Sequence, residues 1–329
     1  MPELMSALGN VVLHKVDGEK GEGPELEKQL QVAGHPTFVL LNTSGETVDR
    51  WWGYSKADKF IAKLNAGLQD PTTIDQKRTR FATKPTMGDA EKLASFHETR
   101  EEYKDAVGYY GEAQKLAAGS DRDFRYALFE ATADGASGDD FSLAQAKQAA
   151  DVALAYEGRT LDQVLGIAGT MTVLGRKKQD RDIMVPYLKL AMSESATSQD
   201  EDIQKSRKRL TAYHALYVER DEAKAVALRK EVLDADWQQD PKKLNSFAWW
   251  CFEGRVNLEE AEALARKGVE LAADGKTKAK ILDTLAEICN VRDNCKDAVH
   301  FMELAVAADP QAEEYPKKLE QFRKNLAAR

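Results

Sequence analysis

Two hydrophobic patterns divide this chain near residue 70. Short runs rich in β-branched and aromatic residues, at 11–17 (VVLHKVD), 37–42 (TFVLLN) and 47–52 (TVDRWW), predict three strands. Amphipathic segments at 24–32 and 55–68 predict helices between and after the strands. Beyond residue 72 the chain is rich in Ala, Leu, Glu and Lys, with helical periodicity. We therefore expect a small mixed region followed by an all-helical one.

Turn residues set the order of elements in the first region. The segment TSGE separates the second and third runs closely enough for a hairpin. Pro24 suits the first turn of one helix, and Ser55 is expected to cap the next. Trp51 and Trp52 alternate across the third strand, so one of the two rings is expected to face away from the core.

Small residues recur in the helical region at successive spacings of 12 and 7. Residues with large side chains lie between them, which indicates antiparallel helix pairs that approach closely at the small positions. Further pairs fit loosely at 122–156, 160–193 and 203–235. Tyr315, Leu319 and Phe322 form a stripe on a final charged helix that is expected to cover the end of the array. The three clear sets are Ala94, Ala106 and Ala113; Trp249, Ala261 and Gly268; and Ala286, Ala298 and Ala305.

Composition excludes several classes of protein. The 329 residues carry a net charge of -8 with a pI near 5.4, which argues against nucleic-acid binding. The basic run at 205–209 (KSRKR) is interpreted as a solvated helix face. No run approaches the roughly 18 apolar residues of a membrane span, and no secretion signal is present. As written the chain is expected in the cytoplasm, or in the periplasm or outside the cell if a leader precedes it.

The three cysteines do not form a disulfide framework. In the repeat register, Cys289 and Cys295 occupy positions that pack between paired helices, so they are expected to be buried thiols. The same register brings them close enough for a disulfide in an oxidising compartment, and both alternatives stay open. No metal site is expected, because Cys295 and His300 point about 140° apart on one helix.

Catalytic motifs are not found in the sequence. Neither a His-Glu-x-x-His nor a Ser-His-Asp pattern can be assembled, and GEKGEGPE lacks the Gly-Lys-Ser/Thr ending of a phosphate loop. We expect no catalytic residue and no cofactor in the chain as given.

The helical region resembles tetratricopeptide repeats. The resemblance is carried by EEYKDAVGYYGEAQKLA (101–117) and by ILDTLAEICNVRDNCKDAVHFMELAVAADP (281–310), which ends in the proline that commonly closes a repeat, Pro310. It covers residues 87–310, strongly at both ends and weakly in the middle. It implies a right-handed solenoid whose concave face binds peptide or protein partners.

The first region resembles, in order and spacing, the second half of a thioredoxin. The resemblance implies a cis bond before Pro36 and a groove for an extended substrate strand at His35, Pro36 and Thr37. The alternative is that Pro36 merely begins a strand. The Cys-x-x-Cys that carries thioredoxin chemistry is absent, since its thiolate must come from a helix N-terminus that this chain lacks.

The segment missing from this resemblance includes the central strand of the thioredoxin sheet. We therefore expect Met1 to lie inside a helix of the family, with about 40–60 residues and the redox motif upstream. If the chain does begin at Met1, the strands at 11–17 and 37–42 are expected to pair directly in parallel.

The predicted organisation has four parts. They are a truncated thioredoxin-like three-layer domain at 1–70, a linker with a short helix at 71–86, about five helical hairpins at 87–310 and a capping helix at 311–329. The predicted function is thiol-disulfide handling or binding of protein substrates, without turnover in the chain as given. The alternative is a non-catalytic scaffold for protein interactions.

Overall fold

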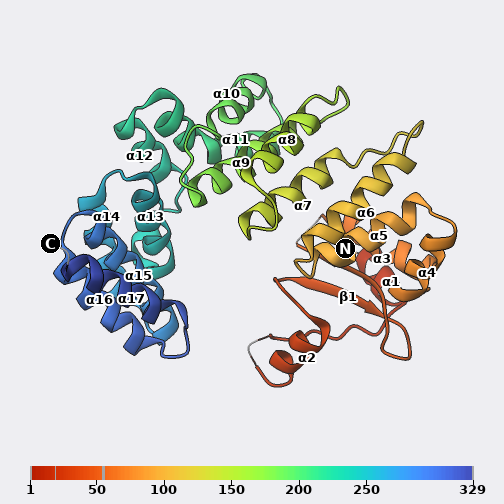
Figure 1. Cartoon of the computed structure of the whole chain (residues 1–329), viewed down its shortest axis with the longest axis horizontal. Helices are drawn as coiled ribbons and strands as arrows, with labels where there is room; N and C mark the ends of the chain where they lie inside the picture. The colour runs from red at the N-terminus through yellow and green to blue at the C-terminus, as the bar shows by residue number, and fades with distance from the viewer. Residues whose placement is uncertain (1, 19, 54–55, 328–329) are drawn as a thin grey trace. The chain divides into compact units, whose positions relative to one another are not determined.

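The computed structural model describes residues 2–18, 20–53 and 56–327. Helices dominate these residues, and a single hairpin supplies both described strands (Figure 1). The chain divides into two compact units, which meet between Arg159 and Thr160 in the sequence. Unit 1 ends at Arg159 and contains the hairpin, whereas unit 2 is helical. Met1 and Ser55, to which the sequence analysis assigned roles, lie outside the described residues.

Two of the three predicted strands are formed. The strands β1 (Thr37–Leu41) and β2 (Thr47–Trp52) pair antiparallel, as the TSGE turn predicts. Phe38 lies opposite Trp51, and their rings stack with centroids 5.7 Å apart. Trp51 is buried and Trp52 is half-buried, so the alternation predicted for the two indoles is confirmed.

The predicted strand at 11–17 is wrong. These residues form no strand and no ladder with β1, so the direct parallel pairing is also not formed. Val12 is 99% exposed and Leu13 is 67% exposed. A β-branched run forms a stable strand only where a neighbouring strand accepts its backbone hydrogen bonds and covers its side chains. No described strand pairs with residues 11–17, and residues 12–15 are exposed.

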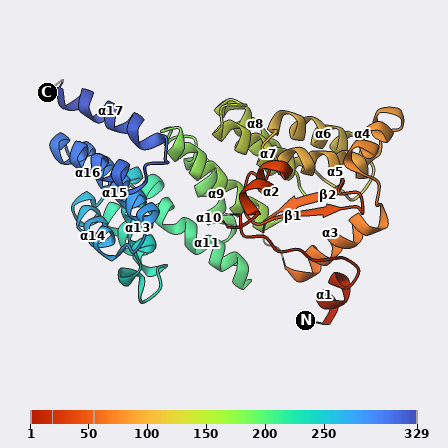
Figure 2. The same cartoon turned by 90° about the horizontal axis from the view of Figure 1, so that it is seen from below.

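Helices lie on both faces of the hairpin. The helices α1 (Pro2–Leu8) and α3 (Ala57–Gln69) lie on one face (Figure 2). Their apolar side chains pack with Phe38, Leu40 and Trp51. The other face meets α2 (Gly23–Leu30), which begins with a proline in its first turn as predicted. Gly67 lets α3 approach closely, because a Cβ there would lie 2.6 Å from Leu40. The thioredoxin-like arrangement itself stays a prediction.

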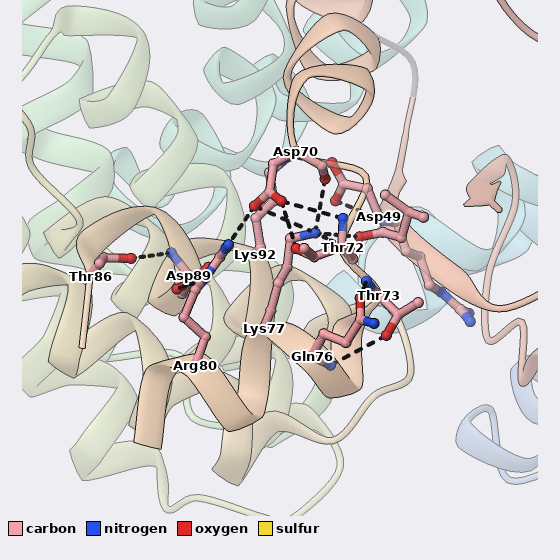
Figure 3. A network of polar contacts seen from close by, with 12 residues as sticks. Asp49, Asp70, Thr72, Thr73, Gln76, Lys77, Arg80, Thr86, Asp89 and Lys92 are labelled. Atoms are coloured by element: carbon pink, nitrogen blue, oxygen red, sulfur yellow. Dashed lines mark hydrogen bonds and ion pairs between the residues drawn. The ribbon is translucent and has the colours of Figure 1, made fainter. Parts of the chain in front are cut away.

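A buried polar network joins β2 to the next two helices, α4 (Ile74–Thr83) and α5 (Met87–Glu98) (Figure 3). Lys77 of α4 is only 2% exposed, and its ammonium group donates to three backbone carbonyls. Lys92 of α5 pairs with the buried carboxylate of Asp49. Burial alone would raise the pKa of Asp70, but hydrogen bonds from Arg80 and Thr72 outweigh burial and lower that pKa to about 2. Residues 71–86 are therefore bound firmly to the sheet.

Capping side chains explain where several helices begin. Thr73, Ser142 and Thr160 each accept a hydrogen bond from a backbone amide in the first turn of the helix that follows. In each case the side-chain oxygen of the glutamine three residues later accepts a hydrogen bond from the backbone amide of the capping residue, which completes a capping box. This arrangement satisfies amide groups that a helix N-terminus otherwise leaves unpaired.

Six consecutive helix pairs occupy residues 87–308, where about five hairpins were predicted. In unit 1, α5 is followed by α6 (Tyr103–Leu116), α7 (Arg125–Ser137) and α8 (Leu143–Leu154). Unit 2 contains α9 (Leu161–Lys177), α10 (Val185–Glu194), α11 (Glu201–His214) with its π-helical extension η1 (Ala215–Glu219), α12 (Glu222–Glu231), the short η2 (Trp237–Gln239), α13 (Pro241–Gly254), α14 (Leu258–Leu271), α15 (Gly275–Val291) and α16 (Cys295–Ala308).

The positions with spacings of 12 and 7 are the points of close helix approach. Eight of the nine residues singled out are buried, and the exception is Trp249, which is half-buried. The last helix, α17 (Glu314–Ala327), buries Tyr315 and Phe322 as the predicted stripe requires. Within the described residues, no helix is both long enough and apolar enough to cross a bilayer.

Candidate functional site

The turn before β1 brings the three predicted substrate-binding residues together. The bond between His35 and Pro36 is cis, and the Pro36 carbonyl accepts a 2.9 Å hydrogen bond from the Gly53 amide. The hydroxyl of Thr37 donates to the Gly34 carbonyl at 2.5 Å. The imidazole of His35 is exposed and contacts a carboxylate of α2.

One edge of the hairpin is open in the described residues. Because Pro36 bonds to Gly53, alternation along the ladder turns the backbone groups of Thr37 and Val39 away from β2. No hydrogen bond to these outward groups, or to the backbone of His35, is found among residues 2–18, 20–53 and 56–327. Such an edge can accept an added strand from another chain.

Apolar side chains lie beside this open edge. The face of β1 that carries Val39 and Leu41 meets Leu26 and Leu30 of α2 around a shallow pocket. The pocket also contacts His14 and His35 at its rim. An added strand would therefore find apolar surface for every second side chain.

The three cysteines lie in the interior of unit 2. Cys251, Cys289 and Cys295 are buried and carry free thiols. Burial raises the pKa of Cys251 and of Cys289 to about 12, so both thiols are protonated at neutral pH. The disulfide between Cys289 and Cys295 is not formed in this structure, and its formation on oxidation stays a prediction. The structure therefore gives no support to thiol-disulfide handling by these residues.

Unit 2 contains a groove that sequence reasoning missed. It has a volume of about 590 Å³ and lies at the C-terminal ends of α9, α13 and α15, beside η1. The helices α9, α13 and α15 are each the first helix of a pair, and η1 extends the first helix of the pair between them. Successive helix pairs therefore contribute to one surface. We call this surface the unit 2 groove. Its side chains include Arg176, Arg181, Tyr217, Trp249, Phe252, Glu253, Arg255 and Glu287.

An ion pair joins two helices at the base of the groove. Arg176 of α9 pairs with Glu253 of α13 and is 90% buried by its surroundings, with 10% of its side chain exposed. Its guanidinium lies 4.9 Å from the ring centroid of Tyr213 and donates to the Tyr213 hydroxyl at 2.8 Å. These contacts hold Arg176 in one position, so it is part of the groove's framework.

Aromatic side chains supply the apolar part of the groove. The rings of Trp249 and Phe252 lie 5.0 Å apart, and both side chains are half-buried. In the repeat register Trp249 stands where Ala94 and Ala286 stand, and both alanines are fully buried. A large aromatic residue at an alanine position is the signal by which the sequence could have located this groove.

A cluster of potential metal ligands lies in unit 1. His97, Glu102 and Asp105 have side-chain ligand atoms within 4.8 Å of one another. Glu102 already pairs with His97 at 2.6 Å and with Arg100 at 2.8 Å. The carboxylate that a metal ion would need is thus engaged in an ion-pair network.

Comparison with known proteins assigns no family. No protein-family model matches the chain, and a search of curated proteins finds no match. A solved structure that is similar is that of YrrB, described as a TPR protein with an unusual peptide-binding site. It is 12% identical with a TM-score of 0.35, and the alignment covers 75% of this chain and 100% of that chain. The helix-pair architecture described above rests on this chain's own helices.

Proposed function

We propose that this protein is a binding scaffold whose unit 2 groove holds a peptide segment of a partner protein. The observation that carries the proposal is Trp249, a half-buried indole at a register position where two other helix pairs bury alanine. Packing of the helix pair does not require an indole there, because alanine serves at Ala94 and Ala286. A half-buried indole beside Phe252 is suited to an apolar side chain of a ligand.

The dimensions of the groove fit a peptide. A volume of about 590 Å³ lies in the range of sites for small ligands and short peptide segments. The wall is mixed, because both aromatic rings and charged groups line it, which suits a segment that carries apolar and polar side chains. Arg176 and Glu253 are held by each other, so the site is largely formed before a ligand arrives.

Selection of peptides tests this proposal. Twelve-residue peptides displayed on phage would be selected on the full chain, and their affinities measured by fluorescence anisotropy. We expect Trp249→Ala to weaken binding at least tenfold, because a central aromatic anchor contributes about 2 kcal/mol or more. The matched control is Trp52→Ala, which removes a half-buried indole from unit 1. Equal affinity of both variants and the unaltered protein would contradict the groove as the binding site.

A second candidate site is the open edge of β1, favoured by the outward backbone groups of Thr37 and Val39. We propose that His35, Pro36 and Thr37 begin this edge and that an extended segment of a protein substrate pairs along it. Thiol exchange on such a segment would need thiols from outside the residues described here. This site lies in unit 1, and Trp52 stands opposite Thr37 in the ladder, so Trp52→Ala and Trp249→Ala distinguish the two sites.

Amide exchange measured by NMR tests the second candidate. In the free protein the amides of Phe38 and Leu40 should exchange slowly, because they donate to β2, whereas those of Thr37 and Val39 should exchange fast. A peptide selected for binding to the Trp249→Ala variant should slow the exchange of the Thr37 and Val39 amides. Unchanged exchange at both residues in the presence of saturating peptide would rule out strand addition.

A further inference from the structure

The charges of the unit 2 groove are unevenly neutralised. Four of its side chains are cationic, namely Arg176, Lys177, Arg181 and Arg255, and two are anionic, Glu253 and Glu287. Both acids are engaged, because Glu253 pairs with Arg176 and Glu287 pairs with Lys318 at 3.1 Å. Arg181 and Arg255 add positive charge to the groove on a chain whose net charge is -8.

Two of these cations are available to a ligand. Arg181 and Arg255 are exposed, and no ion pair to either is found in the part of the chain that the structure describes. Asp180, the neighbour of Arg181, is turned toward its own loop, where it accepts from the backbone amides of Asp182 and Ile183. The guanidinium groups therefore face the groove without a carboxylate of their own.

Helix ends reduce this excess without removing it. The C-terminal ends of α9, α13 and α15 each carry about half a negative charge in the partial charges of their last carbonyls. Lys177, in the last turn of α9, offsets part of that charge. Arg181 and Arg255 lie beyond the last residues of α9 and α13, so a positive field remains where the groove opens.

We propose that the unit 2 groove selects an acidic peptide segment, whose carboxylates pair with Arg181 and Arg255 while an apolar side chain contacts Trp249 and Phe252. This inference rests on the proposed peptide-binding function. Arginine suits the role because its planar guanidinium binds carboxylates through two parallel hydrogen bonds. A groove that presents both aromatic and cationic side chains favours a segment that carries both acidic and apolar residues.

Two labelled decapeptides test the charge preference. Both carry two leucines on a Ser/Gly background, one with three glutamates and the other with three lysines, and both bear an uncharged dye. We expect the glutamate peptide to bind the full chain at least tenfold more tightly at about 50 mM salt, with a smaller preference at high salt because ions screen exposed charges. Equal or tighter binding of the lysine peptide would overturn the inference.

Charge reversal in the groove gives the second part of the test. The double variant Arg181→Glu/Arg255→Glu should abolish or invert the preference for the glutamate peptide. The control Lys208→Glu/Arg209→Glu makes the same change in charge on the exposed face of α11 and should leave that preference unchanged. Both variants alter exposed side chains, and their thermal unfolding should match that of the unaltered protein. An unchanged preference in the groove variant would overturn the inference.

Failure of the inference and failure of the proposed function give different results. If Trp249→Ala weakens binding of the selected peptides but charge reversal has no effect, the groove binds peptides without selecting acidic ones. If neither change affects binding of any peptide, the groove is not a peptide site. Binding that Trp52→Ala weakens instead would place the peptide at the open edge of β1.

Discussion

The ammonium group of Lys77 donates a 3.2 Å hydrogen bond to the backbone carbonyl of Val48, on the edge of β2 that faces away from β1. Ser95 does the same for the next outward carbonyl, that of Arg50, at 3.0 Å. Side chains from α4 and α5 thus take the place of a neighbouring strand. One edge of the hairpin is closed by helices, and the edge formed by β1 is open in the part of the chain that the structure describes.

Replacing Lys77 with methionine tests the importance of this closure. Lys77→Met retains the aliphatic stem but leaves the carbonyls of Val48, Asp70 and Thr72 without their donor. Because unmet buried acceptors are unfavourable, and the 3.8 Å ion pair of Lys77 with the partly exposed Asp70 is also lost, we expect the free energy of unfolding of unit 1 to fall by about 2–4 kcal/mol. Hydrogen exchange measured by mass spectrometry on peptides from β2 and α4 would report the loss.

The control for this change is another lysine of the same segment. Lys84→Met alters an exposed side chain just after α4 and should change stability by less than about 0.5 kcal/mol. Exchange of peptides from α13 to α15 should be the same in both variants, because both changes lie in unit 1 and these helices belong to unit 2. Similar effects of Lys77→Met and Lys84→Met would mean that the buried network contributes little.

Glu98 makes the stability of unit 1 depend on pH. Burial raises the pKa of its carboxyl from 4.5 to about 7, although the hydrogen bond from the Tyr110 hydroxyl at 2.9 Å opposes this. The charge of Asp134 adds to the effect of burial, and Lys63 opposes it. A raised pKa favours the protonated form in the folded state. The contribution of Glu98 to the stability of unit 1 is therefore complete below pH 4.5 and is lost as the pH rises through 7.

Denaturant unfolding at several pH values checks this dependence. We expect stability to fall by on the order of 2–3 kcal/mol between about pH 4.5 and 7.5, and Glu98→Gln to remove most of the decline. A smaller decline should remain, because burial also raises the pKa of Asp134. Tyr110→Phe should shift the decline to higher pH by deleting a hydrogen bond that favours the carboxylate. Identical profiles for Glu98→Gln and the unaltered protein would contradict the assignment.

The buried cysteines should react only when unit 2 opens. In the native protein we expect Cys251, Cys289 and Cys295 to resist a thiol reagent such as DTNB, since each is buried and two have a pKa near 12. Denaturant should expose all three. Mass spectrometry without reductant after mild oxidation would test the predicted disulfide between Cys289 and Cys295, which would lower the mass by two hydrogens.

Local patterns predict the elements of this protein better than its surfaces. The hairpin, the helix pairs and the stripe on α17 follow from periodicity within short segments, which is why Tyr315 and Phe322 could be placed from sequence. The run at 11–17 has the composition of a strand, but its state depends on a partner elsewhere in the fold. Composition alone gives no information about that partner.

The site was harder to predict for the same reason. His35, Pro36 and Thr37 are adjacent in sequence, so their meeting at one turn needed no tertiary information. The unit 2 groove joins Arg176, Trp249 and Glu287, which are far apart in the chain and share only a place at the ends of their helices. The departure of Trp249 from a register of small residues was visible, but its exposure required the packing of the helix pairs.

The contrast between Trp249 and Ala286 supplies a final prediction. The two residues are equivalent in the repeat register. Ala286 is fully buried in a close-packed helix contact, whereas Trp249 is half-buried. Ala286→Trp should therefore destabilise unit 2 by more than about 3 kcal/mol, because an indole cannot enter a close-packed helix contact without displacing its neighbours.

Trp249→Ala should leave unit 2 folded, with a loss of about 1–2 kcal/mol from the apolar surface that the indole buries. Ala307→Trp is the matched control for Ala286→Trp, because Ala307 is exposed on α16 and tolerates a large side chain. Thermal unfolding followed by circular dichroism would rank the three variants. If Ala286→Trp unfolded at the same temperature as Ala307→Trp, the two register positions would be equally open, and the indole of Trp249 would no longer mark a binding surface.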